Sequence, residues 1–111
     1  MTRDGTDPHN VDEVLARPKR LAIVAHLYHK GPTSMAELRR ALGVTWGCLY
    51  SNLKALRKAG YVDTRITLTP WGPRTIVTLT PLGRRKLRET LEGLEKLLKL
   101  PKSPREEPHR T

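Results

Sequence analysis

The order of helix caps and helix-ending residues constrains this chain more than any other feature of its sequence. Ser34 is followed three positions later by Glu37, which is the spacing of a capping box, where each side chain satisfies the other residue's backbone N–H. The pattern predicts a helix over 34–42. Gly43 follows directly, at the position where a left-handed residue stops a helix.

A further helix is expected immediately after this glycine. Thr45 is suited to cap a helix over 45–59, which Gly60 would end. Two helices joined by a short glycine-containing turn, the first of about nine residues, have the proportions of a helix-turn-helix. An ordinary helical hairpin would show the same pattern, so the pair alone does not settle the fold.

Two helices are expected before this pair. Asn10 and Glu13 have the spacing of a capping box and predict a short helix over 11–16. Pro18 would end that helix and suits the first turn of the next, over 18–30, whose apolar residues form one stripe.

From residue 61 the pattern changes from helical to alternating. Over 61–68 the side chains alternate, and residues 75–79 are again rich in β-branched types. The Pro/Gly-rich segment 69–74 lies between them, so a hairpin with its loop at 69–74 is predicted. Thr80 and Pro81 then supply a cap and a first-turn proline for a long final helix that reaches about residue 100.

Positive charge is concentrated in the central half of the chain. The net charge is +10, and residues 39–88 carry all of the excess, with Asp63 as their single anion. A surface tuned only for solubility would intersperse both signs, so this segregation indicates a polyanion binder. The alternative is that the whole surface is basic, as in some thermophilic proteins. The absence of Gln also favours a thermophilic source for the chain. The eleven cations are Arg39, Arg40, Lys54, Arg57, Lys58, Arg65, Arg74, Arg84, Arg85, Lys86 and Arg88.

Six stretches of sequence form an ordered set. They are RLAI at 20–23, AELR at 36–39, LGVT at 42–45, LKALRKAGYV at 53–62, PRT at 73–75 and LTPLGRR at 79–85. Together they resemble the winged helix-turn-helix DNA-binding regulators of the MarR/ArsR type, particularly their short single-domain archaeal and bacterial forms. The resemblance implies DNA binding by the third helix and the wing, in a symmetric dimer that represses or tunes transcription.

The outward side of the 45–59 helix supplies the expected DNA contacts. Its leucines cluster within about 60° on a helical wheel and must face the core. Ser51 and Lys54 on the other side suit base edges or phosphates, and Gly47 would let the backbone approach DNA closely. The expected nucleic-acid-binding residues, with those of the wing, are Thr45, Trp46, Gly47, Tyr50, Ser51, Lys54, Arg65 and Arg74.

The role of both tryptophans stays open. Trp46 either contacts DNA or plugs the preceding turn, and Trp71 either stiffens the wing or packs on sugar rings. Arg74, at the expected wing tip, is suited to the minor groove or a phosphate.

The last helix carries leucines at spacings of 4, 3 and 4, which is an a/d seam typical of helix pairing. We expect the seam to form a homodimer interface, although a stripe of this kind can also cover the domain's own core. A dimer would place two recognition helices about 34 Å apart on a pseudo-palindromic site. The expected interface residues are Leu87, Leu91, Leu94 and Leu98.

Other kinds of chemistry are not expected. The chain has no catalytic motif, so we expect no enzyme, and we expect no cofactor. His26 and His29 are spaced to chelate a metal but lack a Cys or Asp cluster nearby, so no metal is expected. Cys48 is the single cysteine and cannot form an internal disulfide, and no apolar run is long enough to span a membrane. These features indicate a cytoplasmic protein.

The sequence therefore predicts one domain of the α+β class, mainly α: a winged helix-turn-helix with a long C-terminal dimerisation helix. Its parts are a flexible N-terminus (1–9), the DNA-binding domain (10–80), the dimerisation helix (81–100) and a disordered tail (101–111). The expected function is sequence-specific regulation of transcription on double-stranded DNA. The alternatives are a winged-helix protein-interaction module and a non-specific, chromatin-like DNA binder. The target promoter and any small-molecule effector are left open.

Overall fold

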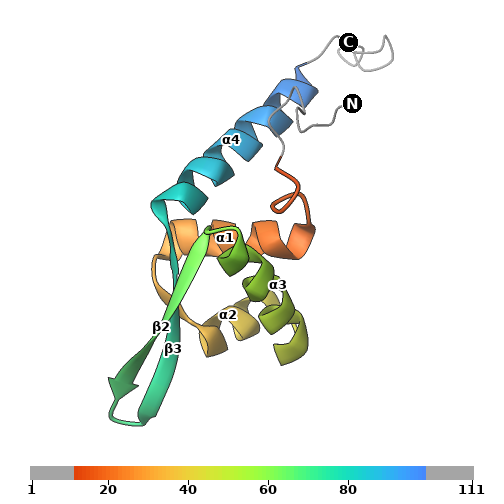
Figure 1. The fold of residues 1–111 in the computed structure, drawn as a ribbon. Helices are drawn as coiled ribbons and strands as arrows, with labels where there is room; N and C mark the ends of the chain where they lie inside the picture. The colour runs from red at the N-terminus through yellow and green to blue at the C-terminus, as the bar shows by residue number, and fades with distance from the viewer. Residues whose placement is uncertain (1–11, 100–111) are drawn as a thin grey trace.

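Residues 12–99 of the computed structural model form four helices and a small three-stranded antiparallel sheet (Figure 1). Strand order in the sheet is β1-β3-β2, and the hairpin of β2 and β3 projects away from the helices. This arrangement confirms the expected α+β, mainly helical, winged helix. The elements are α1 (Pro18–Lys30), β1 (Thr33–Ser34), α2 (Met35–Leu42), α3 (Trp46–Lys58), β2 (Val62–Thr69), β3 (Gly72–Leu79) and α4 (Pro81–Leu98).

Hydrogen bonds confirm the predicted capping of α2. The Ser34 hydroxyl accepts from the Glu37 backbone N–H at 3.1 Å, and the Glu37 carboxylate accepts from the Ser34 backbone N–H at 3.3 Å. At the other end Gly43 has a φ of +66°, a left-handed conformation that favours glycine. The turn between the two helices therefore begins where the sequence placed it.

The cap and the buried side of α3 are also as predicted. The Thr45 hydroxyl accepts from the backbone N–H of Cys48 at 3.1 Å. Leu49, Leu53 and Leu56 are at most 3% exposed and belong to the apolar core. Because these leucines fix the rotation of α3, its opposite side faces solvent.

The predicted helix over 11–16 is wrong for the residues that the structure describes. The Asp12 carboxylate accepts from the backbone N–H groups of Val14 and Leu15, at 2.8 and 3.3 Å, and closes a turn over 13–16. Arg17 is extended because it precedes Pro18, which leaves no room for a second helical turn. The expected cap Asn10 lies outside the described residues.

The hairpin is longer than predicted, and its turn is shorter. Pairing is continuous from Val62 opposite Leu79 to Thr69 opposite Gly72, so only residues 70–71 form the turn. The expected loop over 69–74 is therefore wrong, and Arg74 lies within β3, opposite Thr67. Pro73 is tolerated there because the described partner of β3 on its other side, β1, lies farther along the strand.

Strand β1 was not predicted from the sequence. It is two residues long, with Thr33 opposite Val77 and Ser34 opposite Ile76. Two residues are too few to show a period of two. The strand ties the start of α2 to the base of the hairpin.

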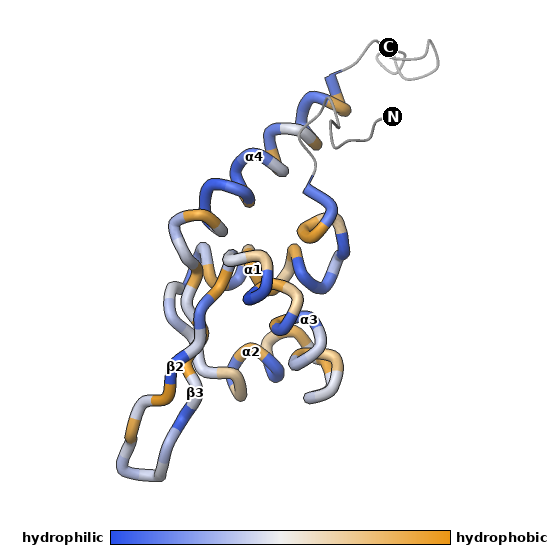
Figure 2. Tube along the Cα trace, in the orientation of Figure 1, coloured by the Kyte–Doolittle hydropathy of each residue, from blue (hydrophilic) through white to orange (hydrophobic). Residues whose placement is uncertain are grey.

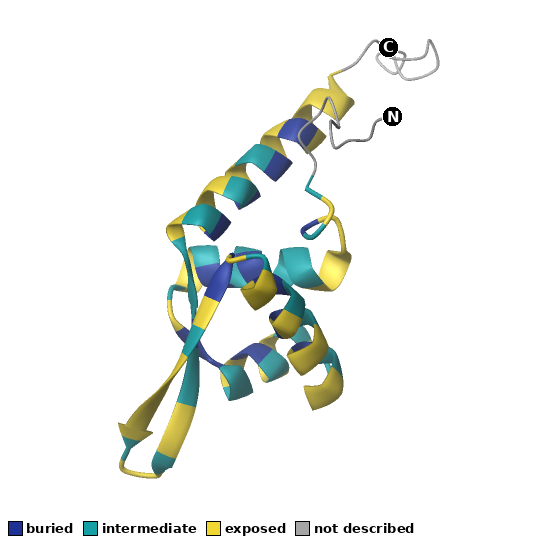
Figure 3. Cartoon of the chain, in the orientation of Figure 1, coloured by how far each residue is buried: buried dark blue, intermediate teal, exposed yellow. Residues whose placement is uncertain are grey.

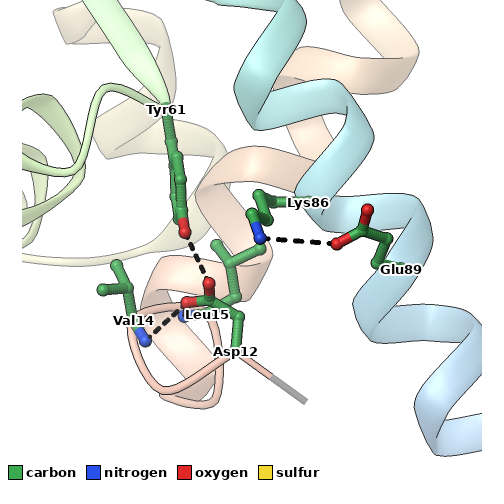
Figure 4. Close-up of polar contacts among 6 residues, drawn as sticks. All are labelled: Asp12, Val14, Leu15, Tyr61, Lys86 and Glu89. Carbon is green, nitrogen blue, oxygen red and sulfur yellow. Dashed lines mark hydrogen bonds and ion pairs between the residues drawn. The ribbon is translucent and has the colours of Figure 1, made fainter. Parts of the chain in front are cut away.

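Contacts around Tyr61 join the hairpin, α4 and the segment before α1 (Figure 4). The Tyr61 hydroxyl donates to the Asp12 carboxylate at 2.5 Å, and the Tyr61 carbonyl accepts from the Thr80 backbone N–H at 3.0 Å. A Cβ added to Gly83 would lie 2.1 Å from that carbonyl oxygen. The first turn of α4 therefore lies directly against backbone, which only glycine allows.

The leucines of α4 fall into two groups. Leu87 is 2% exposed and packs in the core of its own chain, so it is not part of an exposed seam. Leu91, Leu94 and Leu98 are 49%, 36% and 77% exposed. Figure 1 shows the end of α4 extending away from the other helices, and Figure 3 shows mostly exposed residues there.

Replacing Gly83 with alanine should destabilise the fold. The added methyl group would overlap the Tyr61 carbonyl, and α4 would have to shift. We expect the free energy of unfolding in urea to fall by about 1–3 kcal/mol. Gly47→Ala is the matched control because Gly47 is also helical and has nothing within 4 Å of an added Cβ. Equal stabilities of the two variants would contradict the close contact.

Removing the Tyr61 hydroxyl should change stability at high pH. Burial, followed by the hydrogen bond to Asp12, raises the pKa of Tyr61 above its ordinary value of 10.0. The unfolded chain therefore loses this proton first, and the stabilisation is present below pH 10 and is lost as pH rises above it. In urea titrations Tyr61→Phe should be about 1.5–3 kcal/mol less stable at neutral pH and should show a smaller alkaline loss.

The matched control for that measurement is Tyr28→Phe. The Tyr28 ring lies 4.9 Å from the Arg84 guanidinium, a contact that phenylalanine retains. This variant should keep the alkaline loss of the original chain. The same alkaline loss in Tyr61→Phe as in the original chain would refute the role of the Tyr61 hydroxyl.

Candidate nucleic-acid interface

The solvent-facing side of α3 brings together six of the predicted DNA-binding residues. All six are exposed, whereas the leucines on the other side of α3 are buried. The Thr45 hydroxyl is engaged as a helix cap but keeps its own proton to donate. The space around Gly47 is open. The six residues are Thr45, Trp46, Gly47, Tyr50, Ser51 and Lys54.

Trp46 lies at the surface, in a stack of flat side chains. It is 42% exposed, and its ring is 5.8 Å from that of Tyr50 with an angle of 29° between the planes. The Arg39 guanidinium lies over the Trp46 ring, 5.1 Å from the ring centre. The Trp46 ring therefore contacts neighbours on two helices, one of them at the end of the helix before the turn.

Arg39 is a residue that the sequence did not single out. It belongs to the last turn of α2, and its Nε atom is buried with no hydrogen-bond partner within residues 12–99. Stacking on Trp46 instead orders the guanidinium beside α3. The sequence feature that could have predicted this contact is an arginine before the predicted turn and a tryptophan after it. Such a pair places a cation and an aromatic ring on adjacent helix ends.

Asn52 has a structural role. Its amide donates to the Cys48 carbonyl at 2.8 Å and accepts from the Arg20 guanidinium at 3.2 Å. The bond to Cys48 lies within α3 and positions the Asn52 amide, and the bond from Arg20 connects α3 to α1. They help to fix the direction in which α3 presents its outer side.

The two predicted arginines of the hairpin lie on one face of it. Arg65 is opposite Ile76, and Arg74 is opposite Thr67, so the two arginines are diagonal neighbours. Both are exposed. The structure thus places all eight predicted residues at the surface of two elements, α3 and the hairpin.

The eleven cations of residues 39–88 form two groups. Seven belong to α2, α3 and the hairpin, while the four of α4 lie on the far side of α1 from α2 and α3 (Figure 1). Ion pairs within residues 12–99 join Lys86 to Glu89 and Lys99 to Glu95, so none neutralises a cation of the first group. The charge available to a polyanion at α3 is therefore smaller than the sequence suggested.

A metal site and a membrane-spanning helix each have requirements that can be compared with residues 12–99. No group of three or more His, Cys, Asp and Glu side chains is arranged to hold a metal ion there. In the same range, none of the helices has the length and apolar character needed to cross a membrane.

A family model described as a winged helix DNA-binding domain matches residues 19–98. Among solved structures, a transcriptional regulator homologue from Pyrococcus horikoshii OT3 matches with a TM-score of 0.76 and 25% identity, over 83% of this chain and 91% of that chain. A regulator of the MarR family from Porphyromonas gingivalis W83 matches with a TM-score of 0.66 and 22% identity, over 89% and 92%. MarR itself matches with a TM-score of 0.67 and 17% identity, over 78% and 62%. A search of curated protein sequences gives no match.

These comparisons agree with the geometry. The matched range includes α2, α3, the β2–β3 hairpin and α4. The fold is that of MarR, as the sequence resemblance implied. The chain belongs to the winged helix DNA-binding domain family.

Proposed function

We propose that the chain is a sequence-specific transcription regulator that binds double-stranded DNA as a homodimer. In this proposal α3 enters the major groove, and the hairpin contacts the adjacent minor groove and backbone. The observation that carries it is the outer side of α3, which is exposed and whose Lys54 has no ion pair within residues 12–99. The hairpin adds the exposed arginines Arg65 and Arg74. The regulatory role is supported by the Pyrococcus relative, which is named a transcriptional regulator homologue.

Individual residues suit different parts of the duplex. Ser51 and Lys54 lie one helical turn apart and can reach base edges or phosphates. The absence of a side chain at Gly47 lets the backbone of α3 lie close to the groove. Arg39 and Tyr50 hold the Trp46 ring in place, which lowers the entropy lost when that ring contacts DNA.

The dimer is supported by the exposed leucines of α4. They continue the side of the helix on which Leu87 is buried, and Leu94 and Leu98 lie beyond Gly93, the last buried residue of α4. Leaving such side chains in water costs about 25 cal/mol per Å² of apolar surface, and a second α4 would cover them. Leu97, which is 40% exposed, widens this surface beside Leu91, Leu94 and Leu98.

DNA binding is tested by fluorescence anisotropy with labelled duplexes, comparing random DNA with a duplex selected from a random pool. We expect tighter binding of the selected duplex, and affinity that falls steeply with salt concentration. Lys54→Ala should reduce the salt slope by about one. Arg85→Ala, which removes a cation of α4, is the matched control and should leave the slope unchanged. Gly47→Ala should weaken binding at least about tenfold while the fold keeps its stability.

The outcomes separate the alternatives. No binding to any duplex at low salt would contradict the proposal and favour a protein-interaction module. Equal affinity for selected and random duplexes would favour a non-specific DNA binder. Full affinity in Gly47→Ala would refute a close approach of α3 to the groove.

Replacing Leu91 and Leu94 together with aspartate should give a monomer in sedimentation velocity. Two charges in an apolar helix pair would be desolvated without partners, which costs several kcal/mol. Arg85→Asp adds an acidic residue elsewhere on α4 and should remain a dimer. Circular dichroism checks that the variant is folded. A dimer that persists in the double variant would exclude this surface as the interface.

A further inference from the structure

The outer half of the hairpin carries apolar side chains in open solvent. Ile66, Leu68 and Trp71 are 71%, 81% and 85% exposed. Figure 2 shows the apolar stretches of β2 beyond the helices, and Figure 3 shows this part of the hairpin as largely exposed. Three large apolar side chains on a two-stranded ribbon are unfavourable in water, so they point to a contact that residues 12–99 do not supply.

Strand register divides the hairpin into two unlike faces. Ile66 and Leu68 alternate with Arg65, and Arg74 lies on the arginine side of the ribbon. The face of Ile66 and Leu68 is the same one that is buried at the base of the sheet by Val62 and Val77. Because the α3 leucines share one core with Val62 and Val77, the apolar face is turned toward α3 at the base of the sheet, and the arginine face is on the opposite side of the ribbon.

The turn holds Trp71 at the tip. The Thr69 hydroxyl donates to the Gly72 carbonyl at 2.6 Å and accepts from the Trp71 backbone N–H at 3.2 Å. Gly72 has a φ of +110°, which a residue with a side chain rarely adopts. Pro70 removes further freedom from the two-residue turn. The indole is therefore presented by an ordered turn, although nothing within residues 12–99 covers it.

Duplex DNA fits both faces at once. If α3 occupies a major groove, the strand between that groove and the adjacent minor groove passes between α3 and the hairpin. The apolar face then meets deoxyribose rings of this near strand, while Arg65 and Arg74 meet phosphates of the far strand. A second copy of the chain is a poorer occupant, because a stable interface takes about 800 Å² from each partner, more than these three side chains offer.

We infer that the hairpin grips the minor groove with its apolar face and that Trp71 stacks in the groove floor and partly opens a base step. This inference rests on the proposed function and adds a specific contact to it. Apolar wedges of this kind kink duplexes by roughly 20–90°. Regulation would then depend on how easily the DNA at the hairpin deforms, in addition to the bases read by α3.

Tryptophan fluorescence can follow α3 and the hairpin separately. Trp46→Phe leaves Trp71 as the single indole, and Trp71→Phe leaves Trp46, so each reports one element of the interface. Both variants are titrated with the selected duplex at low salt, while anisotropy of a dye on the DNA confirms saturation. We expect the emission of Trp71 to be quenched on binding and its access to acrylamide to fall.

A second measurement separates stacking from charge. Trp71→Ser should weaken binding roughly 10- to 100-fold with an unchanged salt slope, and it should reduce the bend of the duplex measured by energy transfer between end-labels. Trp71→Phe should restore most of the bend. Arg74→Ala is the matched control, because it should lower the salt slope by about one and keep the bend.

Failure of this inference is distinguishable from failure of the proposed function. If Trp46 responds to bound DNA while Trp71 keeps its emission and its access to acrylamide, the hairpin contact is wrong and DNA binding by α3 stands. If the original chain binds no duplex, the proposed function itself falls. Protection of Trp71 that grows with protein concentration in the absence of DNA would identify a second copy as the occupant and would overturn the inference.

Discussion

The contact between Gly83 and the Tyr61 carbonyl sets the geometry on which the other features depend. The missing side chain at Gly83 lets α4 lie against the backbone at the base of the hairpin. The Tyr61 hydroxyl, in the same residue, donates a hydrogen bond to the Asp12 carboxylate before α1. Through these contacts α4 has a fixed direction relative to α3. In the proposed dimer, paired α4 helices would therefore set the separation of the two recognition helices, which must match a helical repeat of DNA.

The exposed leucines of α4 lie apart from the surface assigned to DNA. They are at the far end of α4, whereas the predicted DNA contacts are on α3 and the hairpin. The cations of α4 include Lys86, which is paired with Glu89. This separation lets one chain use two unlike surfaces, because a partner helix and a duplex would not compete for the same residues.

Local signals predicted most of the fold, and contacts distant in sequence account for what they missed. The caps at Ser34 and Thr45 depend on neighbours three residues away, so the sequence alone places them. Strand β1 exists only through its pairing with β3, which no local pattern reveals. All eight predicted DNA-contacting residues are exposed, but Arg74 lies in a strand since a short turn at 70–71 replaced the expected loop. Leu87 shows that a leucine repeat does not tell which members face the chain's own core.

The central claim is that α3 and the hairpin bind neighbouring grooves of one duplex, twice in each dimer. Hydroxyl-radical footprinting on the selected duplex tests it most directly, because cleavage reports protection of each sugar on both strands. The account predicts two protected segments related by a two-fold axis, about one helical turn apart, each with protection in the minor groove beside the major groove that α3 enters. A single protected segment, or uniform weak protection along the duplex, would contradict it.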